Sequence, residues 1–229
     1  MSRRLAVPPL LAAATGALLL LAGCSADPLN VVILNARAPG EKCDFLDSTV
    51  FVARGTLDFR PGGDALFFGY FQAFSWENQM QPPVINVSGD KVDPGGGNDF
   101  IGDTIVYDYQ YSDPAVTLAS ETQNVREAIS AGATPDKNFM GADLIQPKAL
   151  AALNASLTPT AQTLVVTFQM FGKTAGGTSK HTNKVSFPLT VYNSAPGVNI
   201  LPCPTGTKLY LGPCGVAGRD APVQCVSAQ

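Results

Sequence analysis

Apolar and polar residues alternate with a period of two over three long stretches of the chain, at 105–111, 164–171 and 185–192. This alternation is typical of β-strands that bury one face and expose the other. The second and third stretches flank a glycine-rich segment at 172–178, so together they predict a long hairpin. Pro188 has no backbone N–H to donate, which predicts an edge position or a bulge for the last strand.

Shorter apolar runs predict further strands at 31–34, 49–59, 66–76 and 84–88. Within the second run, Gly55 predicts a bulge or a bend. The run at 66–76 is apolar on both faces, which favours a central strand covered on both sides over a strand that faces a partner.

The strand pattern weakens in the middle of the chain, where residues 123–131 could form one or two helical turns and 148–153 another. Twenty-two glycines and 18 prolines indicate many turns, and only 14% of the residues are charged. We therefore predict the all-β class, an antiparallel β-sandwich with long loops and at most one or two short helices. No repeat or low-complexity linker divides the chain, so residues 30–229 are predicted to form a single domain.

The N-terminus has the three parts of a secretory signal: Arg3 and Arg4, an apolar stretch without charge up to Asp27, and small residues at its end. A stretch of about 20 apolar residues is also long enough to cross a bilayer, so length alone does not exclude an anchor helix. The sequence Leu21-Ala22-Gly23-Cys24 decides between them, because it resembles a bacterial lipobox.

That resemblance implies that residues 1–23 are a cleaved lipoprotein signal peptide and that Cys24 carries acyl chains such as palmitate. Residues 24–29 then form the lipidated N-terminus and a tether that reaches about 15 Å. Two or three acyl chains anchor a protein stably, whereas one binds only marginally. Ala26 resembles the outer-membrane sorting pattern of enteric lipoproteins, so we favour an exported protein at the outer membrane, on its periplasmic or surface face.

Charge argues against a nucleic-acid partner. The full chain has 18 acidic and 15 basic residues. Loss of Arg3 and Arg4 with the signal would remove two of the basic residues and make the chain more acidic. Nucleic-acid binding needs a basic surface, which this acidic balance does not supply.

Four cysteines remain beside Cys24, and in an oxidising compartment they predict two disulfides among Cys43, Cys203, Cys214 and Cys225. Four cysteines allow three pairings, of which we favour Cys43–Cys203 with Cys214–Cys225, a staple on the C-terminal tail. The competing interpretation is a metal site. Zinc ligands usually come in close pairs, however, whereas ten residues separate Cys203 from Cys214 and ten separate Cys214 from Cys225.

A combination of short segments after Cys24 is distinctive: 54–58 (RGTLD), 77–80 (ENQM), 172–177 (GKTAGG), 186–188 (SFP), 213–214 (PC) and 224–225 (QC). Together they resemble a group of uncharacterised envelope lipoproteins from myxobacteria and related deltaproteobacterial lineages. The likeness runs over most of the chain after Cys24 and lies mainly in turns and strand ends. The resemblance implies an envelope location and supplies no activity. Members often carry further cysteines where this chain has Tyr192 and Asn193, so their disulfide pairing does not transfer.

The motifs of common enzymes are missing. His181 is the only histidine, and no Gly-x-Ser-x-Gly elbow or phosphate-binding glycine loop occurs. Glu77 follows Trp76, as in a fragment of a sugar site, but we favour the simpler interpretation of a strand-end glutamate beside a core tryptophan. We therefore predict no catalytic residues and a protein that is not an enzyme.

Two groups of residues are candidates for binding. An acidic, glycine-rich loop could coordinate calcium as a cofactor through Asp90, Asp93, Asp99 and Asp103. Aromatic side chains could hold a ligand such as a glycan at Trp76, Tyr107, Tyr109 and Tyr111.

The sequence therefore predicts a membrane-anchored envelope lipoprotein that acts as a non-enzymatic structural or partner-binding module. Its partners would be the membrane, through the acyl chains on Cys24, and an envelope protein or a glycan. One alternative is a surface adhesin that binds carbohydrate or calcium. The other is a hydrolase that uses carboxylates alone, which would need two of them about 5–9.5 Å apart in a pocket.

Overall fold

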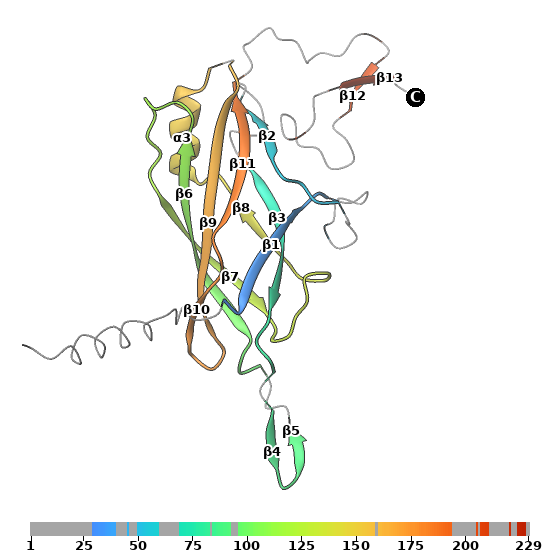
Figure 1. The fold of residues 1–229 in the computed structure, drawn as a ribbon. Coiled ribbons are helices and arrows are strands. Elements are labelled where there is room, and N and C mark those ends of the chain that lie inside the picture. Colours follow the sequence, from blue (N-terminus) through green and yellow to red (C-terminus); the bar gives the residue numbers. More distant parts are fainter. Residues whose placement is uncertain are drawn as a thin grey trace, which may run out of the picture.

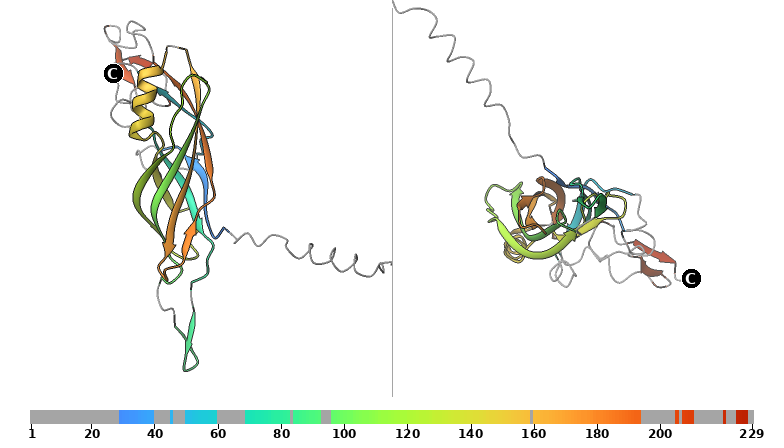
Figure 2. Two further views of the ribbon diagram at one scale, coloured as in Figure 1. Left: turned by 90° about the vertical axis from the view of Figure 1, so that its left-hand side faces the viewer. Right: turned by 90° about the horizontal axis from the view of Figure 1, so that it is seen from below.

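The computed structural model describes residues 29–39, 45, 50–59, 69–82, 84–92, 96–158, 160–193, 205, 207–210, 220 and 224–227. This part of the chain is built almost wholly of strands, with two sheets packed against each other and one short helix (Figure 1). The larger sheet curls, so that the sandwich approaches a half-barrel when it is viewed along its length (Figure 2). The predicted all-β sandwich is confirmed.

The larger sheet has six strands in the order β2-β11-β9-β6-β7, with β10 paired to β9. Their bounds are β2 Gly55–Asp58, β6 Phe100–Tyr111, β7 Glu121–Ile129, β9 Gln162–Thr174, β10 Ser179–His181 and β11 Val185–Tyr192. Every pairing in this sheet is antiparallel except that of β2 with β11.

The smaller sheet has the order β1-β3-β8, with β1 at Val31–Arg37, β3 at Phe71–Asn78 and β8 at Phe139–Asp143. Two separate hairpins pair β4 (Ile85–Val87) with β5 (Asp90–Val92) and β12 (Thr207–Tyr210) with β13 (Gln224–Ser227). The β4–β5 hairpin projects beyond one end of the sandwich (Figure 2). The helix α3 spans Pro147–Ser156.

The long hairpin predicted from the glycine-rich turn is confirmed, because β9 and β11 pair along seven positions from Val185–Phe168 to Val191–Gln162. Pro188 lies opposite Val165 in that pairing, and the register with β2 begins only at the next residue. At Pro188 the strand therefore has a partner on one side alone, which is where a residue without an N–H is tolerated.

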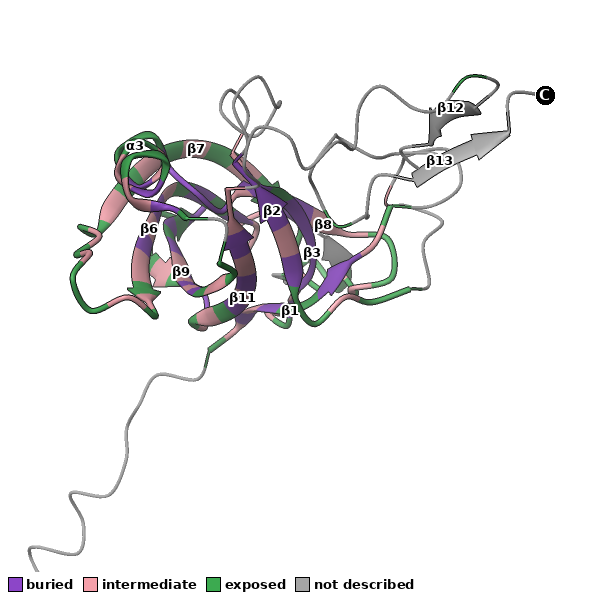
Figure 3. Cartoon of the chain, turned by 90° about the horizontal axis from the view of Figure 1, so that it is seen from above, coloured by how far each residue is buried: buried purple, intermediate pink, exposed green. Residues whose placement is uncertain are grey.

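Buried residues lie on the strand faces that the two sheets turn toward each other (Figure 3). This core is rich in aromatic rings. Phe74 of β3 packs against Phe168 of β9, with ring centroids 4.9 Å apart, and Trp76 meets Phe100 of β6 edge-on at 6.4 Å. Residues 72–76 of β3 are all buried, on both faces of the strand. The covered central strand is thereby confirmed for this stretch, while residues 66–68 lie outside the described residues.

The predicted helical turns at 123–131 are wrong, because β7 occupies Glu121–Ile129 and pairs with β6. Exposed and part-buried positions alternate along this strand, but most of the inward positions are polar or charged, such as Gln123 and Glu127. Apolar alternation was therefore absent from the sequence although the backbone follows a period of two. The helix predicted at 148–153 is confirmed by α3.

Gly55 marks a close approach of side chain to backbone and not a bulge. A Cβ atom there would overlap the hydroxyl of Tyr70, a side chain that is 1% exposed. That hydroxyl donates to the Asp220 carboxylate, 2.7 and 2.8 Å from its two oxygens. The Thr56 N–H also donates to Asp220, over 2.8 Å, so this point of the C-terminal region is held at β2.

The outer edge of β1 is sealed by a side chain. The Ile33 N–H donates to Asn183 Oδ1 over 2.7 Å, and Asn183 Nδ2 donates to the Ile33 carbonyl over 2.9 Å. Asn183 lies between β10 and β11, so its amide takes the place of a neighbouring strand and ties the smaller sheet to the larger one. Beyond Ile33, the Ala38 N–H donates to the Val50 carbonyl and the Val52 N–H donates to the Ala36 carbonyl, so backbone hydrogen bonds cover the same edge there.

Several predictions fall on residues outside the described ones, namely the signal peptide and tether up to residue 28 with Cys24, and Cys43, Cys203, Cys214 and Asp93. For Cys225 the backbone alone is described, and it pairs with Leu209 in the β12–β13 hairpin. The disulfides stay a prediction. In the part of the chain that the structure describes, no helix has the length and apolar character needed to cross a membrane.

Candidate functional site

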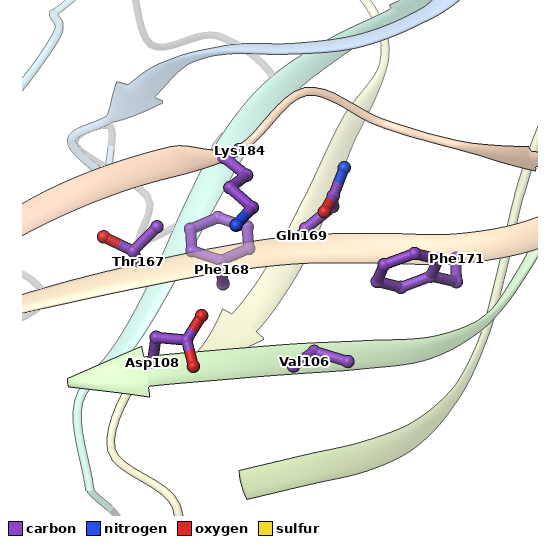
Figure 4. Close-up of a pocket in the computed structure, with 7 residues that line it drawn as sticks. All are labelled: Val106, Asp108, Thr167, Phe168, Gln169, Phe171 and Lys184. Carbon is purple, nitrogen blue, oxygen red and sulfur yellow. The ribbon is translucent and has the colours of Figure 1, made fainter. Parts of the chain in front are cut away.

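A shallow pocket of about 130 Å³ opens on the outer face of the six-stranded sheet, away from the core (Figure 4). It lies over the middle of β6 and β9 and extends to the segment that leads into β11. The residues that line it are Val106, Asp108, Thr167, Phe168, Gln169, Phe171 and Lys184.

Strand alternation and register bring these side chains together. Val106 pairs with Gln169 across the β6–β9 ladder, and Asp108 pairs with Thr167 two residues further on. Directly paired residues of an antiparallel sheet carry their side chains on the same face, with Cβ atoms about 4.5–5.5 Å apart. Lys184 comes from the short link between β10 and β11, and its ammonium group reaches over the ladder (Figure 4).

Two of the polar side chains are fixed by hydrogen bonds before any ligand arrives. Gln169 Nε2 donates to the Thr182 carbonyl over 2.7 Å and lies 3.0 Å from His181 Nδ1. The Ser120 hydroxyl donates to Asp108 Oδ1 over 2.5 Å. The amide oxygen of Gln169 and the second oxygen of Asp108 make no hydrogen bond within the described part of the chain, so both are available as acceptors.

Lys184 supplies the only cation of the pocket lining, and Asp108 the only anion. Among the described residues, the Lys184 ammonium makes no hydrogen bond and no ion pair. The apolar part is formed by Val106 and by Phe171, whose side chain is 38% exposed and lies against the His181 ring at 5.9 Å. The site therefore combines one donor group, several acceptors and an accessible aromatic ring on a rigid ladder.

The structure places two of the predicted aromatic ligands in the core. Trp76 is 2% exposed and Tyr107 is fully buried, so neither ring can stack on a ligand that approaches from solvent. This corrects the expectation for both residues. Its physical reason is that β3 and the inner face of β6 face each other across the sandwich, where large rings fill the space between the sheets.

Tyr107 and Tyr109 belong to a polar network at the inner face of the curled sheet. The Tyr107 hydroxyl donates to Gln123 Oε1 over 2.7 Å, and the Gln146 N–H donates to the Tyr109 hydroxyl over 3.1 Å. Burial is the main cause that raises the pKa of Tyr107 above its ordinary value, and the nearby Tyr109 and Asp143 raise it further. Desolvation raises the pKa of Tyr109 as well, against the opposing effect of the Gln146 hydrogen bond.

Tyr111, the third residue of this face, is partly buried at the end of β6, and desolvation raises its pKa too. These three tyrosines do lie on one face as the sequence predicted, but the face turns inward. The network satisfies buried polar groups and positions α3, which makes it a structural element of the sandwich.

Two glutamates of β7 have structural surroundings. Glu121 accepts from the N–H groups of Lys148 and Ala149 over 3.1 and 2.8 Å, which places a carboxylate at the N-terminus of α3. Desolvation raises the pKa of Glu127, which is partly buried on the same strand. Neither lines the pocket, whose lining holds a single carboxylate. The arrangement that the hydrolase alternative requires is not present there.

The aspartates proposed for calcium have separate places in the fold. Asp99 Oδ1 accepts from the Ala131 N–H over 2.8 Å, Asp90 pairs with Val87 in the projecting hairpin, and Asp103 is exposed on β6. Across the described residues, no three Asp, Glu, His or Cys side chains are grouped as metal ligands. Asp93 lies outside those residues.

The outer-face residues were not singled out from the sequence. The alternation of β6 and β9 could have placed Asp108 and Gln169 on exposed faces, but only the register shows that they meet. Phe171 was visible as an apolar residue at an outward position of a strand, and this was the one available signal.

Comparisons with protein-family models, with curated proteins and with solved structures find no match to this chain.

Proposed function

We propose that this chain is a lipid-anchored bacterial envelope protein that binds a ligand or partner and catalyses no reaction. The observation that carries the binding role is the outer-face pocket, where preorganised acceptors, the Lys184 ammonium group and an exposed aromatic ring gather on a rigid sheet. The anchor is proposed from Leu21-Ala22-Gly23-Cys24 and the apolar stretch before it. Attachment at the outer membrane is proposed from Ala26, two residues after Cys24.

The chemistry around the pocket supports binding over catalysis. His181 is exposed, and among the described residues its ring makes no hydrogen bond to a serine or a cysteine; its Nδ1 lies beside the Gln169 amide and the Thr182 carbonyl. The hydroxyls of Thr167 and Ser186 lie 2.8 Å apart, and within the described residues neither is hydrogen-bonded to Asp108 or His181, as an activated nucleophile would be to its base. A pocket with one carboxylate can orient a ligand but lacks the second group that glycoside hydrolysis needs.

The position of the first described residues agrees with a short tether. β1 starts in the half of the sandwich from which the β4–β5 hairpin projects (Figure 1). With acyl chains on Cys24, a tether of about 15 Å would hold that half next to the bilayer. The pocket lies on a flank of the sheet, so it would stay open to solvent in this orientation.

The anchor is tested by expressing the full chain in a bacterium that processes lipoproteins and supplying an alkyne analogue of palmitate. We expect the protein to incorporate the label, to fractionate with the outer membrane and to begin at the modified Cys24 by mass spectrometry. Cys24→Ala should abolish labelling and cleavage, whereas the matched variant Cys43→Ala should be labelled like the wild type. Equal labelling of Cys24→Ala, or no labelling of the wild type, would overturn the proposed anchor.

A further inference from the structure

We propose that the outer-face pocket binds a neutral sugar residue, with Phe171 against the apolar face of the sugar ring and with Asp108, Gln169 and Lys184 bonded to its hydroxyls. This inference rests on the proposed binding function and names its ligand class. None of these four residues was among the aromatic ligand residues predicted from the sequence.

The size of the pocket limits the ligand to a ring-sized group. Its volume is about 130 Å³, below the roughly 300–1,000 Å³ of pockets for drug-sized ligands. One monosaccharide unit at the end or within a longer glycan matches this space, while the remaining units would extend over the open sheet face.

The charge of the pocket favours a neutral ligand. A phosphate or carboxylate would be attracted by Lys184 but repelled by Asp108, and an ammonium ligand would meet the reverse situation. A sugar hydroxyl suits both groups, because it can donate to a carboxylate and accept from an ammonium. The amide oxygen of Gln169 adds a further acceptor at a fixed position, held by the bond from its nitrogen to the Thr182 carbonyl.

The aromatic part of the site supports the same class. Phe171 has a 38% exposed side chain on an internal strand, where nothing among the described residues covers it fully. Val106 lies beside the ladder between this ring and Asp108 (Figure 4). An amphipathic ring with one C–H face and polar edges can contact the apolar residues while its hydroxyls reach the polar ones.

The sheet geometry argues against an extended peptide as the ligand. Peptides often bind by adding a strand to an open sheet edge, where they pair with free backbone groups. The pocket instead lies over β6 and β9, and each of them already has a strand on both sides. The backbone of the site is thus occupied by the sheet, so recognition must come from side chains alone.

Binding should be weak for one sugar and depend on the named side chains. The full chain, purified in detergent, is titrated with neutral methyl glycosides and oligosaccharides by ligand-observed NMR. We expect dissociation constants on the order of 1 mM for the preferred single sugar, as befits a small open site. Lys184→Gln and Phe171→Ala should each weaken binding about tenfold or more.

Matched controls separate the pocket from the rest of the sheet face. Lys173→Gln removes a cation from an exposed position of β9 outside the pocket, and Ile101→Ala removes a 43% exposed apolar side chain from β6. Both should bind like the wild type. Asp103→Asn is the corresponding control for Asp108→Asn, because both residues lie on β6.

The inference is overturned if no neutral glycan in the panel binds to folded protein, if the pocket variants bind as well as the controls, or if anionic ligands or peptides bind in place of sugars. These outcomes leave the anchor standing when Cys24 is still labelled by the palmitate analogue. Conversely, loss of labelling with intact glycan binding would remove the anchor alone.

Discussion

Replacement of Asn183 should destabilise the sandwich far more than an exposed asparagine would. Its side-chain amide makes two hydrogen bonds to the backbone of Ile33, over 2.7 and 2.9 Å, at the outer edge of β1. Ile33 is 2% exposed, so water has little access to its N–H and carbonyl groups once the amide is gone. Asn183→Ala would leave both groups without a partner.

The size of this effect follows from the cost of buried polar groups without partners. Each such group costs about 1–3 kcal/mol, and because Asn183 is only partly buried we take the lower half of that range. Two groups then lower the free energy of unfolding by about 2–4 kcal/mol. For a domain of this size, each kcal/mol corresponds to roughly 2–4 °C in Tm, so a loss of about 6–12 °C is expected for the middle of the range.

Urea denaturation followed by tryptophan fluorescence measures this loss, because Trp76 is the only tryptophan and lies in the core. Asn183→Leu keeps the branching at Cγ without the hydrogen-bonding groups and should lose as much stability as Asn183→Ala if hydrogen bonding is the cause. Asn124→Ala, at an exposed position of β7, should change stability by less than about 0.5 kcal/mol. A loss below about 1 kcal/mol in both Asn183 variants would refute the reasoning.

Two further predictions concern the inner face of the curled sheet. Burial raises the pKa of Tyr107 and Tyr109, so the unfolded chain ionises first and the free energy of unfolding should fall as the pH rises above 10, the ordinary tyrosine value. Urea titrations across this range should show a shallower fall for Tyr107→Phe, and a wild-type stability that stays constant there would contradict the prediction. Glu121→Ala should cost about 1 kcal/mol by removing the carboxylate that accepts from two N–H groups at the start of α3. Helix loss by circular dichroism and thermal melting would check it, and an unchanged Tm would count against the role.

The strands that the sequence predicted best are those with apolar residues at every second position. β9 and β11 were predicted with their hairpin because Leu164, Val166 and Phe168 recur at every second position and a glycine-rich segment follows the first of the two strands. β7 was missed because Gln123 and Glu127 take inward positions that apolar residues usually occupy. They are tolerated there because the curl of the sheet leaves those positions part-buried, and because Gln123 has partners in Tyr107 and Gln146.

For the candidate site the sequence identified residue types but not their environment. Trp76 and Tyr107 looked like ligand platforms, yet the packing of two sheets buries them. Asp108 and Lys184 are 76 positions apart in the sequence, so no local pattern connects them. Their meeting on one sheet face depends on the β6–β9 register and on the path into β11.

The sequence by itself determined the all-β class, most strand positions, the one helix and the prediction of a lipid anchor, because each depends on residues close together in the chain. The tertiary structure alone decided which faces are buried, where β7 lies, and that Asp108, Gln169, Phe171 and Lys184 share a pocket. Burial and register arise from contacts between distant strands. Local periodicity specifies that a strand has two faces, but the packing partner decides which face becomes core and which remains open to a ligand.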